Sequence, residues 1–295
     1  MSRDRLQASI VIVNYQSGPY LARCLSSLAA GCAGFAWDAV VVDNGSLDGS
    51  ERAADGPTGS VRLIRIERNL GFAAAANIGV RATTAPYVLL LNPDARLTPG
   101  CLAPLVDDLE RHPDGAVVAP LVVNEDDTPQ GNARGDPTMM TGLFGRTSLM
   151  RRLVPRFPAV TRNVVPADAS GDCSFEVDWV SGACCLVRRQ AFEDVEGFDE
   201  RYFLYWEDAD LCRRIRRKGW CIRFRPDPAA RVVHTVGRSS AAVSAQAMRA
   251  FHDSAYRYYA THVARGRVNP ARWAAWVLLK ARAWVRGRSR RQETI

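Results

Sequence analysis

Apolar runs of strand length alternate with segments of helical periodicity over the first 125 residues. The β-branched runs at 8–14, 38–43, 61–66, 86–91 and 115–123 predict buried parallel strands. Leucine or alanine recurs at helical spacing over 20–28, 72–82 and 99–111, and 46–50 is typical of a helix cap and first turn. Repeated strand and helix predict an α/β fold with an open, mostly parallel, doubly wound sheet.

The pattern changes after residue 123. Residues 124–178 are rich in Pro, Gly, Asp and Arg and show little periodicity, which is typical of a lid or a mobile loop. Regular patterning returns as an apolar run at 179–187, a helix at 206–218, and strands near 221–224 and 231–233.

Polar residues follow several of the predicted strands directly. Ligands of doubly wound sheets lie beyond the carboxyl ends of the strands, so these residues are candidates for a binding site. They are Asn14-Tyr15, Asp43-Asn44, Arg68-Asn69 and Asn92-Pro93-Asp94. Asp94 lies behind a proline at the end of a strand, where a carboxylate suits a hard cation such as Mg²⁺ or Mn²⁺; a simple turn is the alternative interpretation.

The predicted helix near 206 begins with a cluster of acids. Asp208 shares a helix face with Leu211, Cys212 and Ile215, so it should point inward. Partial burial raises a carboxyl pKa, and this suits Asp208 as a general base. Glu207 could orient Asp208, bind acceptor hydroxyls or favour the helix N-terminus.

Two further charged positions carry a structural and a functional interpretation. Asp210 lies three and four residues before Arg213 and Arg214, and this spacing predicts an ion pair on the helix surface rather than a catalytic group. His234 follows a strand and is either structural or a ligand. The loop after it, which contains Arg238, has the flexible, basic, hydroxyl-rich character of loops that close over phosphates.

Charge and cysteine content narrow the class of protein. The net charge is +8, but residues 241–295 hold eleven Lys and Arg against two acids, so the first 240 residues carry −1. A neutral body with a basic end argues against a nucleic-acid partner. Eight scattered cysteines without CxxC spacing are expected to be reduced core residues. The polar N-terminus and the absence of an 18-residue apolar stretch predict a soluble or peripheral protein without a signal peptide.

Three common α/β chemistries lack their signatures. The chain has no G-x-G-x-x-G after the first strand, no P-loop and no G-x-S-x-G elbow, which disfavours dinucleotide binding, P-loop chemistry and esterase activity.

Several motifs, taken in order, resemble the family 2 glycosyltransferases of GT-A fold. They are Ile10 to Tyr15, Val41 to Ser50, Arg68-Asn69-Leu70-Gly71-Phe72 with Asn77, Leu91 to Asp94, Ser181-Gly182-Ala183 and Trp206-Glu207-Asp208. The resemblance covers about residues 8–240 and is nearest to rhamnosyltransferases that act on polyprenyl-diphosphate-linked sugars. It implies an inverting transfer of one sugar, L-rhamnose from dTDP-rhamnose as the first expectation, to a lipid-linked or cell-envelope glycan.

The resemblance also implies roles for individual residues. Asp208 would be the general base, assisted by Glu207, and Asp94 with His234 would hold a divalent cation. The nucleotide-sugar would contact Asn14, Tyr15, Asp43, Asn44, Arg68, Asn69, Gly71, Asn77, Asn92, Trp179, Gly182 and Arg238. Residues 1–123 would form the nucleotide-binding half of a catalytic domain that ends at 240, and 124–240 the acceptor and catalytic half.

Residues 241–295 are expected to form a basic amphipathic helical tail. Its Trp and Tyr residues lie among arginines, as in segments that contact an anionic membrane surface; packing on the body or on a second subunit of a homo-oligomer is the alternative. With the lipid-linked acceptor that the resemblance implies, this predicts a cytoplasmic protein, peripheral on the inner face of the cytoplasmic membrane.

Other functions stay open at this point. A sibling transferase could use a UDP-sugar such as galactofuranose, N-acetylglucosamine or glucose. Because Asn92 stands where the family's D-x-D motif has its first acid, a silent nucleotide-sugar-binding subunit is a further alternative. A nucleotidyltransferase is disfavoured, because 14–18 lacks a Gly-rich basic signature.

Overall fold

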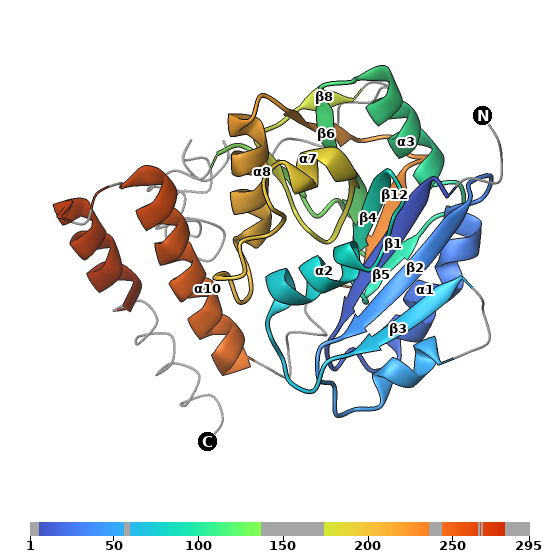
Figure 1. Ribbon diagram of the computed structural model, residues 1–295, viewed down its shortest axis with the longest axis horizontal. Helices are drawn as coiled ribbons and strands as arrows, with labels where there is room; N and C mark the ends of the chain where they lie inside the picture. Colours follow the sequence, from blue (N-terminus) through green and yellow to red (C-terminus); the bar gives the residue numbers. More distant parts are fainter. Residues whose placement is uncertain are drawn as a thin grey trace.

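The predicted parallel strands lie side by side in one large sheet (Figure 1). The structure is a computed structural model that describes residues 6–55, 60–136, 174–235, 244–264, 266 and 268–280. The main strand order is β3-β2-β1-β4-β10-β6-β11-β8. The strands are β1 (Ala8–Asn14), β2 (Trp37–Asp43), β3 (Val61–Arg65), β4 (Tyr87–Leu91), β6 (Gly115–Val123), β8 (Phe175–Glu176), β10 (Cys184–Arg188) and β11 (Cys221–Arg225).

Most neighbouring strands run parallel, which confirms the predicted fold class. β1 pairs in parallel with both β2 and β4, β2 with β3, and β6 with β11. Two short strands extend the sheet beside β6: β12 (Arg231–His234) pairs in parallel with β6 and antiparallel with β5 (Ala95–Leu97). A separate two-stranded sheet joins β7 (Ala133–Arg134) to β9 (Trp179–Val180).

Strand β10 departs from the predicted pattern. The apolar run at 179–187 is not one strand, because it breaks at residues 181–183 between β9 and β10. β10 then runs antiparallel between β4 and β6, with Cys184 opposite Leu91. The amino end of β10 therefore lies beside the carboxyl end of β4, where the backbone N–H of Asn92 donates to the carbonyl oxygen of Ala183 at 3.0 Å.

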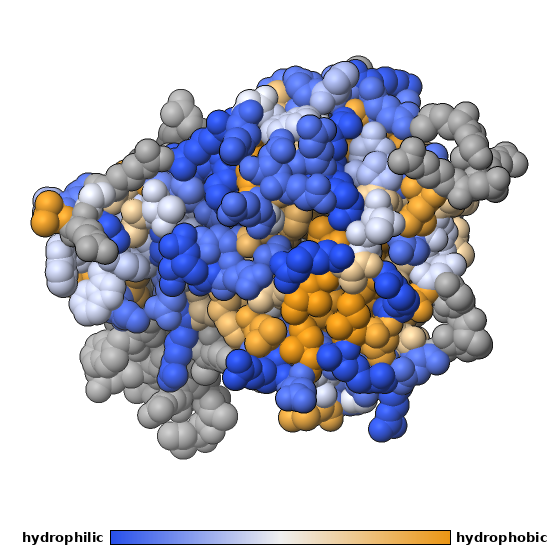
Figure 2. Space-filling model, viewed as in Figure 1, coloured by the Kyte–Doolittle hydropathy of each residue, from blue (hydrophilic) through white to orange (hydrophobic). Residues whose placement is uncertain are grey.

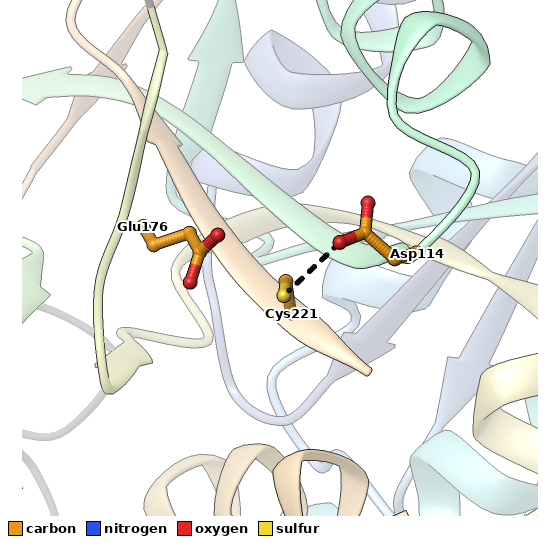
Figure 3. Close-up of side chains that lie close together, drawn as sticks. All are labelled: Asp114, Glu176 and Cys221. Atoms are coloured by element: carbon orange, nitrogen blue, oxygen red, sulfur yellow. Dashed lines mark hydrogen bonds between the residues drawn. The ribbon is translucent and has the colours of Figure 1, made fainter. Parts of the chain in front are cut away.

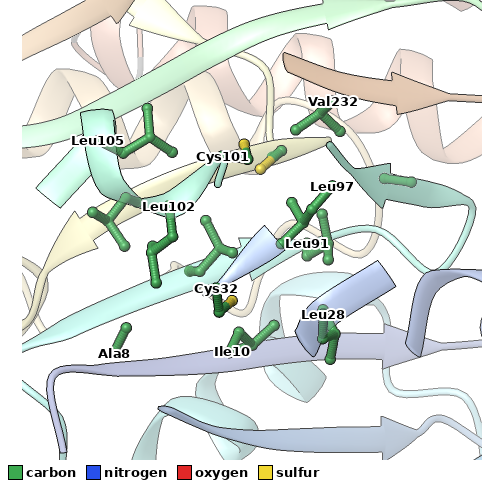
Figure 4. Packing of buried hydrophobic residues seen from close by; sticks show 14 of the residues in the cluster. Ala8, Ile10, Leu28, Cys32, Leu91, Leu97, Cys101, Leu102, Leu105 and Val232 are labelled. Carbon is green, nitrogen blue, oxygen red and sulfur yellow. The ribbon is translucent and has the colours of Figure 1, made fainter. Parts of the chain in front are cut away.

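Helices cover both faces of the sheet, as a doubly wound fold requires. Alternate residues of β1 show this, since Ile10 and Ile12 face one apolar cluster, and Val11 and Val13 face the other. The first cluster includes residues of α1 (Tyr20–Gly31) and α3 (Leu102–Arg111); Figure 4 shows part of its packing. The second includes residues of α2 (Phe72–Arg81), α7 (Arg189–Glu193) and α8 (Glu207–Arg217).

The predicted helices at 20 and 72 begin where expected, and the helix predicted at 206 begins one residue later. α3 begins at Leu102 rather than 99, after the Pro99-Gly100 turn, and the segment after β2 forms a 3₁₀ helix, η1 (Ser50–Ala54). The cysteines of the described ranges are free thiols, and all of them except the partly exposed Cys221 are buried, as expected for reduced core residues. Over α7 and α8 the surface is mostly polar, and apolar side chains gather near α2 (Figure 2).

The C-terminal segment forms helices, as predicted, but its first part is not a free tail. It comprises α10 (Ser244–Tyr258), a π-helical turn η2 (Tyr259–Val263) and a helix at 270–280. Tyr258 is 2% exposed and packs in one small cluster with Tyr202 and Ala209. Among the described residues, no helix is long and apolar enough to cross a membrane.

Candidate active site

The ends of β1 and β2 form a polar cluster around Asp43. Asn14 is fully buried, and its amide donates to Asp43 Oδ1 at 2.8 Å and to Ser50 Oγ at 2.9 Å. The backbone N–H of Ser46 donates to Asp43 Oδ2 at 3.2 Å. Asn14 therefore orients Asp43 from within the protein, and the half-buried Tyr15 is more accessible to a ligand.

A second cluster joins the end of β2 to the start of α2. The Asn44 amide donates to Asn69 Oδ1 at 3.0 Å and to the Gly71 carbonyl at 3.1 Å, and Asn44 Oδ1 accepts the N–H of Leu70 at 2.9 Å. These bonds fix the backbone at 69–71 beside the Asp43 cluster, whereas the adjacent Arg68 is exposed.

Asn77 binds another part of the protein rather than facing open space. It is 4% exposed; its amide donates to the Phe198 carbonyl at 2.9 Å and to Glu200 Oε1 at 3.0 Å, and its Oδ1 accepts the Phe198 N–H at 2.9 Å. Asn77 could contact a nucleotide-sugar only if these hydrogen bonds broke. The geometry gives Asn77 the role of fastening α2 to the loop before α8.

Asp208 lies where the first turn of α8 meets the loop between β9 and β10. Its Oδ2 accepts the backbone N–H of Gly182 at 3.1 Å, and its Oδ1 accepts the N–H of Ala209 at 2.8 Å. Surrounding protein raises the pKa of Asp208, and these two N–H groups and Arg134 partly oppose that rise. Asp208 as a whole residue is partly exposed.

Glu207 has a different environment from its neighbour. It is 7% exposed, and its Oε2 has no hydrogen-bond partner within the described ranges. Burial first, and then the charge of Asp208, raise the pKa of Glu207 well above its usual range. The pair is therefore asymmetric: the pKa of Glu207 is raised well above its usual range, whereas the rise at Asp208 is opposed by its two N–H donors.

Asp210 forms its predicted ion pair, but the pair is not at the surface. Its side chain is 1% exposed, with Arg214 Nε at 2.6 Å and His262 Nε2 also at 2.6 Å. The prediction of a helix-surface pair was wrong because η2 covers this side of α8. Nothing in the local sequence shows that a residue fifty positions later supplies a partner.

Two consecutive residues before α8 have left-handed backbone conformations. Tyr205 has φ +67° and Trp206 has φ +70°. For residues with a Cβ this conformation costs about 1–2 kcal/mol each, so the surrounding structure must hold it. The sequence gives no sign of this strain, because neither residue is Gly, Asn or Asp.

Asp94 and His234 lie together, as the predicted metal site requires. Asp94 Oδ1 is 3.1 Å from His234 Nε2, and the Asn92 amide nitrogen is 3.4 Å from the same Nε2. The antiparallel pairing of β5 with β12 sets Ala95 opposite His234. Asp94, the residue before Ala95, is thereby brought into contact with His234. Asp208 and this cluster occupy one edge of the sheet, where the Asn92 N–H donates to the carbonyl oxygen of Ala183, the residue after Gly182.

Gln130 fixes the tautomer of His234 and was not found from the sequence. Its amide nitrogen donates to the His234 carbonyl at 2.6 Å and to Asn124 Oδ1 at 2.9 Å, so its Oε1 faces His234 Nδ1 at 2.9 Å. In the neutral form of His234, donation from Nδ1 to Gln130 would leave the Nε2 lone pair toward Asp94. An imidazole nitrogen and a carboxylate oxygen placed in this way suit a divalent cation.

A second acidic cluster lies elsewhere in the sheet. Asp114, Glu176 and Cys221 come within ligand distance of one another (Figure 3), and Cys221 Sγ donates to Asp114 Oδ2 at 3.4 Å. Burial is the first cause that raises the pKa of Cys221, to about 11, so the thiol stays protonated. Asp114 lies directly before β6, and Cys221 is the first residue of β11, which runs parallel to β6. Both residues therefore lie at the amino ends of their strands, away from the site residues at the carboxyl ends.

The remaining predicted contacts divide between described and undescribed positions. Trp179 is half-buried; its ring nitrogen donates to the Gly135 carbonyl at 2.9 Å, and the Arg134 guanidinium stacks over it at 5.2 Å. Gly182, predicted to contact the nucleotide-sugar, donates its backbone N–H to Asp208 Oδ2. Arg238 lies outside the described residues, as does most of 124–178.

Comparisons with known proteins agree with this geometry. The pattern of Glycosyl transferase family 2 matches residues 9–195. The chain is 33% identical over 279 residues, 90% of this chain and 87% of the relative, to the N-acetylglucosaminyl-diphospho-decaprenol L-rhamnosyltransferase of Mycobacterium tuberculosis. This chain therefore belongs to glycosyl transferase family 2 and is a glycosyltransferase.

Solved structures share the fold. The crystal structure of GalNAc-T7 with UDP, GalNAc and Mn²⁺ aligns with a TM-score of 0.58 and 17% identity over 79% of this chain and 44% of that one. The structure of S. aureus TarS 1-349 aligns with a TM-score of 0.52 and 16% identity over 84% of this chain and 65% of that one. These similarities confirm the GT-A fold.

Proposed function

We propose that this chain transfers L-rhamnose from dTDP-rhamnose to a polyprenyl-diphosphate-linked sugar, with inversion at the anomeric carbon. The similarity to the mycobacterial L-rhamnosyltransferase extends over 90% of the chain and supports this donor and acceptor class. The observation that carries the chemistry is the bond from the Gly182 N–H to Asp208 Oδ2, which holds the carboxylate of this partly exposed residue at the carboxyl edge of the sheet.

Asp208 is the general base in this mechanism. Each of its oxygens accepts one backbone N–H and keeps a lone pair, so the carboxylate can take the proton of an acceptor hydroxyl. The acceptor oxygen attacks the anomeric carbon as the nucleoside diphosphate leaves from the opposite face, and a single displacement inverts the configuration. The neutral Glu207 adds no second negative charge beside the incoming oxygen.

Other residues bind the donor. Asp43, oriented by Asn14, has the acceptor oxygens to receive an N–H of a pyrimidine base. Arg68 is exposed next to the fixed 69–71 backbone and is available to a diphosphate. Tyr15 and Asn44 complete this end of the site.

A divalent cation fits the cluster at the end of β4. Asp94 and His234 would hold it, with Asn92 as a neutral neighbour, and these oxygen and imidazole groups suit Mn²⁺ or Mg²⁺. A bound cation would neutralise the negative charge that develops on the leaving diphosphate. The Asn in place of an acid removes one negative charge from the site.

The decisive experiment compares the wild type with Asp208→Asn over UDP-, GDP- and dTDP-sugars, with a polyprenyl-diphosphate-linked sugar as acceptor. We expect transfer from dTDP-rhamnose to fall by about 10³-fold or more in the variant, with donor binding retained. Asp107→Asn, an exposed acid on α3, is the matched control and should keep full activity. If the wild type transferred sugar only from a UDP-sugar, dTDP-rhamnose would be excluded as the donor. If Asp208→Asn transferred as fast as wild type, Asp208 would be excluded as the general base.

We infer in addition that the end of the chain contacts an anionic membrane surface from the cytoplasmic side. In the helix at 270–280, Trp273 is 66% exposed, Val277 54% and Leu278 47%, beside Trp276 at 43%. The 241–295 segment holds eleven basic residues, which favour anionic lipid. A protein bound in this way would meet a lipid-linked acceptor where that acceptor is anchored.

A further inference from the structure

The first turn of α8 is held from the side of the C-terminal segment. Ring contacts join Tyr205 to Phe251 at 5.8 Å, and Trp206 to Phe251 at 6.0 Å and to Tyr258 at 5.3 Å. The hydroxyl of Ser254 donates to the Leu204 carbonyl at 3.0 Å. The two strained residues that precede the base therefore rest against α10.

A buried polar contact lies one helical turn beyond this strain. His262 Nε2 donates to Asp210 Oδ1 at 2.6 Å, and both side chains are 1% exposed. Arg214 binds the other oxygen of Asp210 at 2.6 Å. The backbone N–H of Asp210 in turn donates to the Trp206 carbonyl at 2.9 Å and closes the turn that contains Asp208.

The same contacts tie this turn to the rest of the site. Arg214 also donates to the carbonyls of Val195 and Gly197 at 2.7 and 2.8 Å, in the loop that Asn77 fastens to α2. Asp210 therefore contacts both Arg214, which binds the loop next to α2, and His262 of the C-terminal segment. A carboxylate buried to this degree is stable only when its partners are kept.

We propose that His262 is a positioning residue for the transfer reaction. By donating to Asp210 it closes the first turn of α8 against the left-handed pair and so fixes the direction of Asp208 toward the acceptor hydroxyl. This inference rests on the proposed role of Asp208. It makes 244–263 part of the catalytic unit rather than of a separable tail.

The test uses full-length variants and separates positioning from folding. His262→Phe keeps a ring of similar size but removes the donor, and His262→Gln keeps an N–H that can reach Asp210. We expect His262→Phe to lower kcat of transfer tenfold or more, with the dissociation constant of the donor within twofold of wild type. His262→Gln should recover kcat to within about threefold.

A second variant covers the case in which His262→Phe fails to fold. Phe251→Leu, at a half-buried position, removes the ring against Tyr205 and Trp206 and should also lower kcat while donor binding holds. Glu110→Gln, at an exposed position of α3 away from these contacts, is the control and should match wild type.

The outcomes distinguish this proposal from the proposed function. Full kcat in His262→Phe, or an equal loss of kcat in His262→Phe and His262→Gln, would overturn the positioning role of His262. If Asp208→Asn were inactive in the same experiments, the proposed role of Asp208 as the general base would still stand. An active Asp208→Asn would instead remove the proposed base, whatever His262 does.

Discussion

A Cβ atom on Gly71 would lie 2.4 Å from the carbonyl oxygen of Phe203. The backbone carbonyl of Phe203 also accepts the N–H of Phe72 at 2.8 Å. The 69–71 backbone beside the Asp43 cluster is therefore in direct contact with the loop before Asp208. The two halves of the site are thus in backbone contact at this point.

Gly71→Ala should be strongly destabilising. Gly71 has φ +88°, and the added methyl group would meet the backbone of Phe203 as well as its ring, so we expect a loss of about 2–3 kcal/mol in the free energy of unfolding. Gly100→Ala is the matched control. It has φ +73° with no atom within 4 Å of the added Cβ, and should cost about 1 kcal/mol. Denaturant unfolding measures both, and equal losses would show that the contact with Phe203 is unimportant.

The buried Glu207 should make stability depend on pH. Its raised pKa means that the folded state keeps a proton that the unfolded state releases near 4.5. The contribution of Glu207 to stability is therefore full below pH 4.5 and is lost as pH rises through the folded pKa. We expect the stability of wild type relative to Glu207→Gln to decrease from pH 4.5 to 8.

Urea unfolding at several pH values checks this prediction. Glu110→Gln, at an exposed position of α3, serves as the surface control. A constant difference between wild type and Glu207→Gln over this range would contradict the assignment of a protonated Glu207.

Mn²⁺ affinity should depend on Asp94, His234 and Gln130. We expect Asp94→Asn and His234→Ala to weaken Mn²⁺ binding by more than tenfold, and Gln130→Leu by about tenfold because the imidazole loses its fixed tautomer. Calorimetric titration with Mn²⁺ in the presence of the nucleoside diphosphate measures this. Asp126→Asn, an exposed acid on the same loop as Gln130, is the control, and unchanged binding in Asp94→Asn would refute the site.

Membrane binding should depend on the exposed tryptophans at 270–280. Replacing Trp273 and Trp276 together with Ala should weaken binding to vesicles that contain anionic lipid about tenfold, and added salt should weaken the binding of wild type. Leu47→Ala removes an even more exposed apolar side chain from the loop after β2 and should have no effect. Co-sedimentation that is equal for the double variant and wild type would exclude this surface.

Much of the fold could be predicted from the sequence because its signals are local. The runs of β1, β2, β4 and β6 are largely apolar, as buried parallel strands are, and the helices between them show clear periodicity. The break at 181–183 falls at Ser181-Gly182, a pair typical of a turn, and was missed because 179–187 was taken as one regular segment. The antiparallel direction of β10 has no local signal, since it depends on the path of the chain between β6 and β10.

The candidate site was predictable where its residues follow strands or begin a helix. Asp43, Asp94 and Asp208 were found in this way, and His234 does lie beside Asp94. Gln130 and His262 were not found, because each acts through a partner more than fifty residues away. Asn14 and Asn77 were assigned to ligand contact, whereas the structure engages their side chains in bonds that orient Asp43 and the loop before α8.

The central position of β10 has a consequence for how the chain folds. β1 to β4 and their helices lie close together in sequence and can pair as they are synthesised, but the free side of β4 gains its partner only when Cys184–Arg188 has emerged. Closing so long a loop is entropically costly and slow. Until then the apolar edge of β4 is open to pairing with another chain, so the period before β10 docks is when aggregation most threatens this protein.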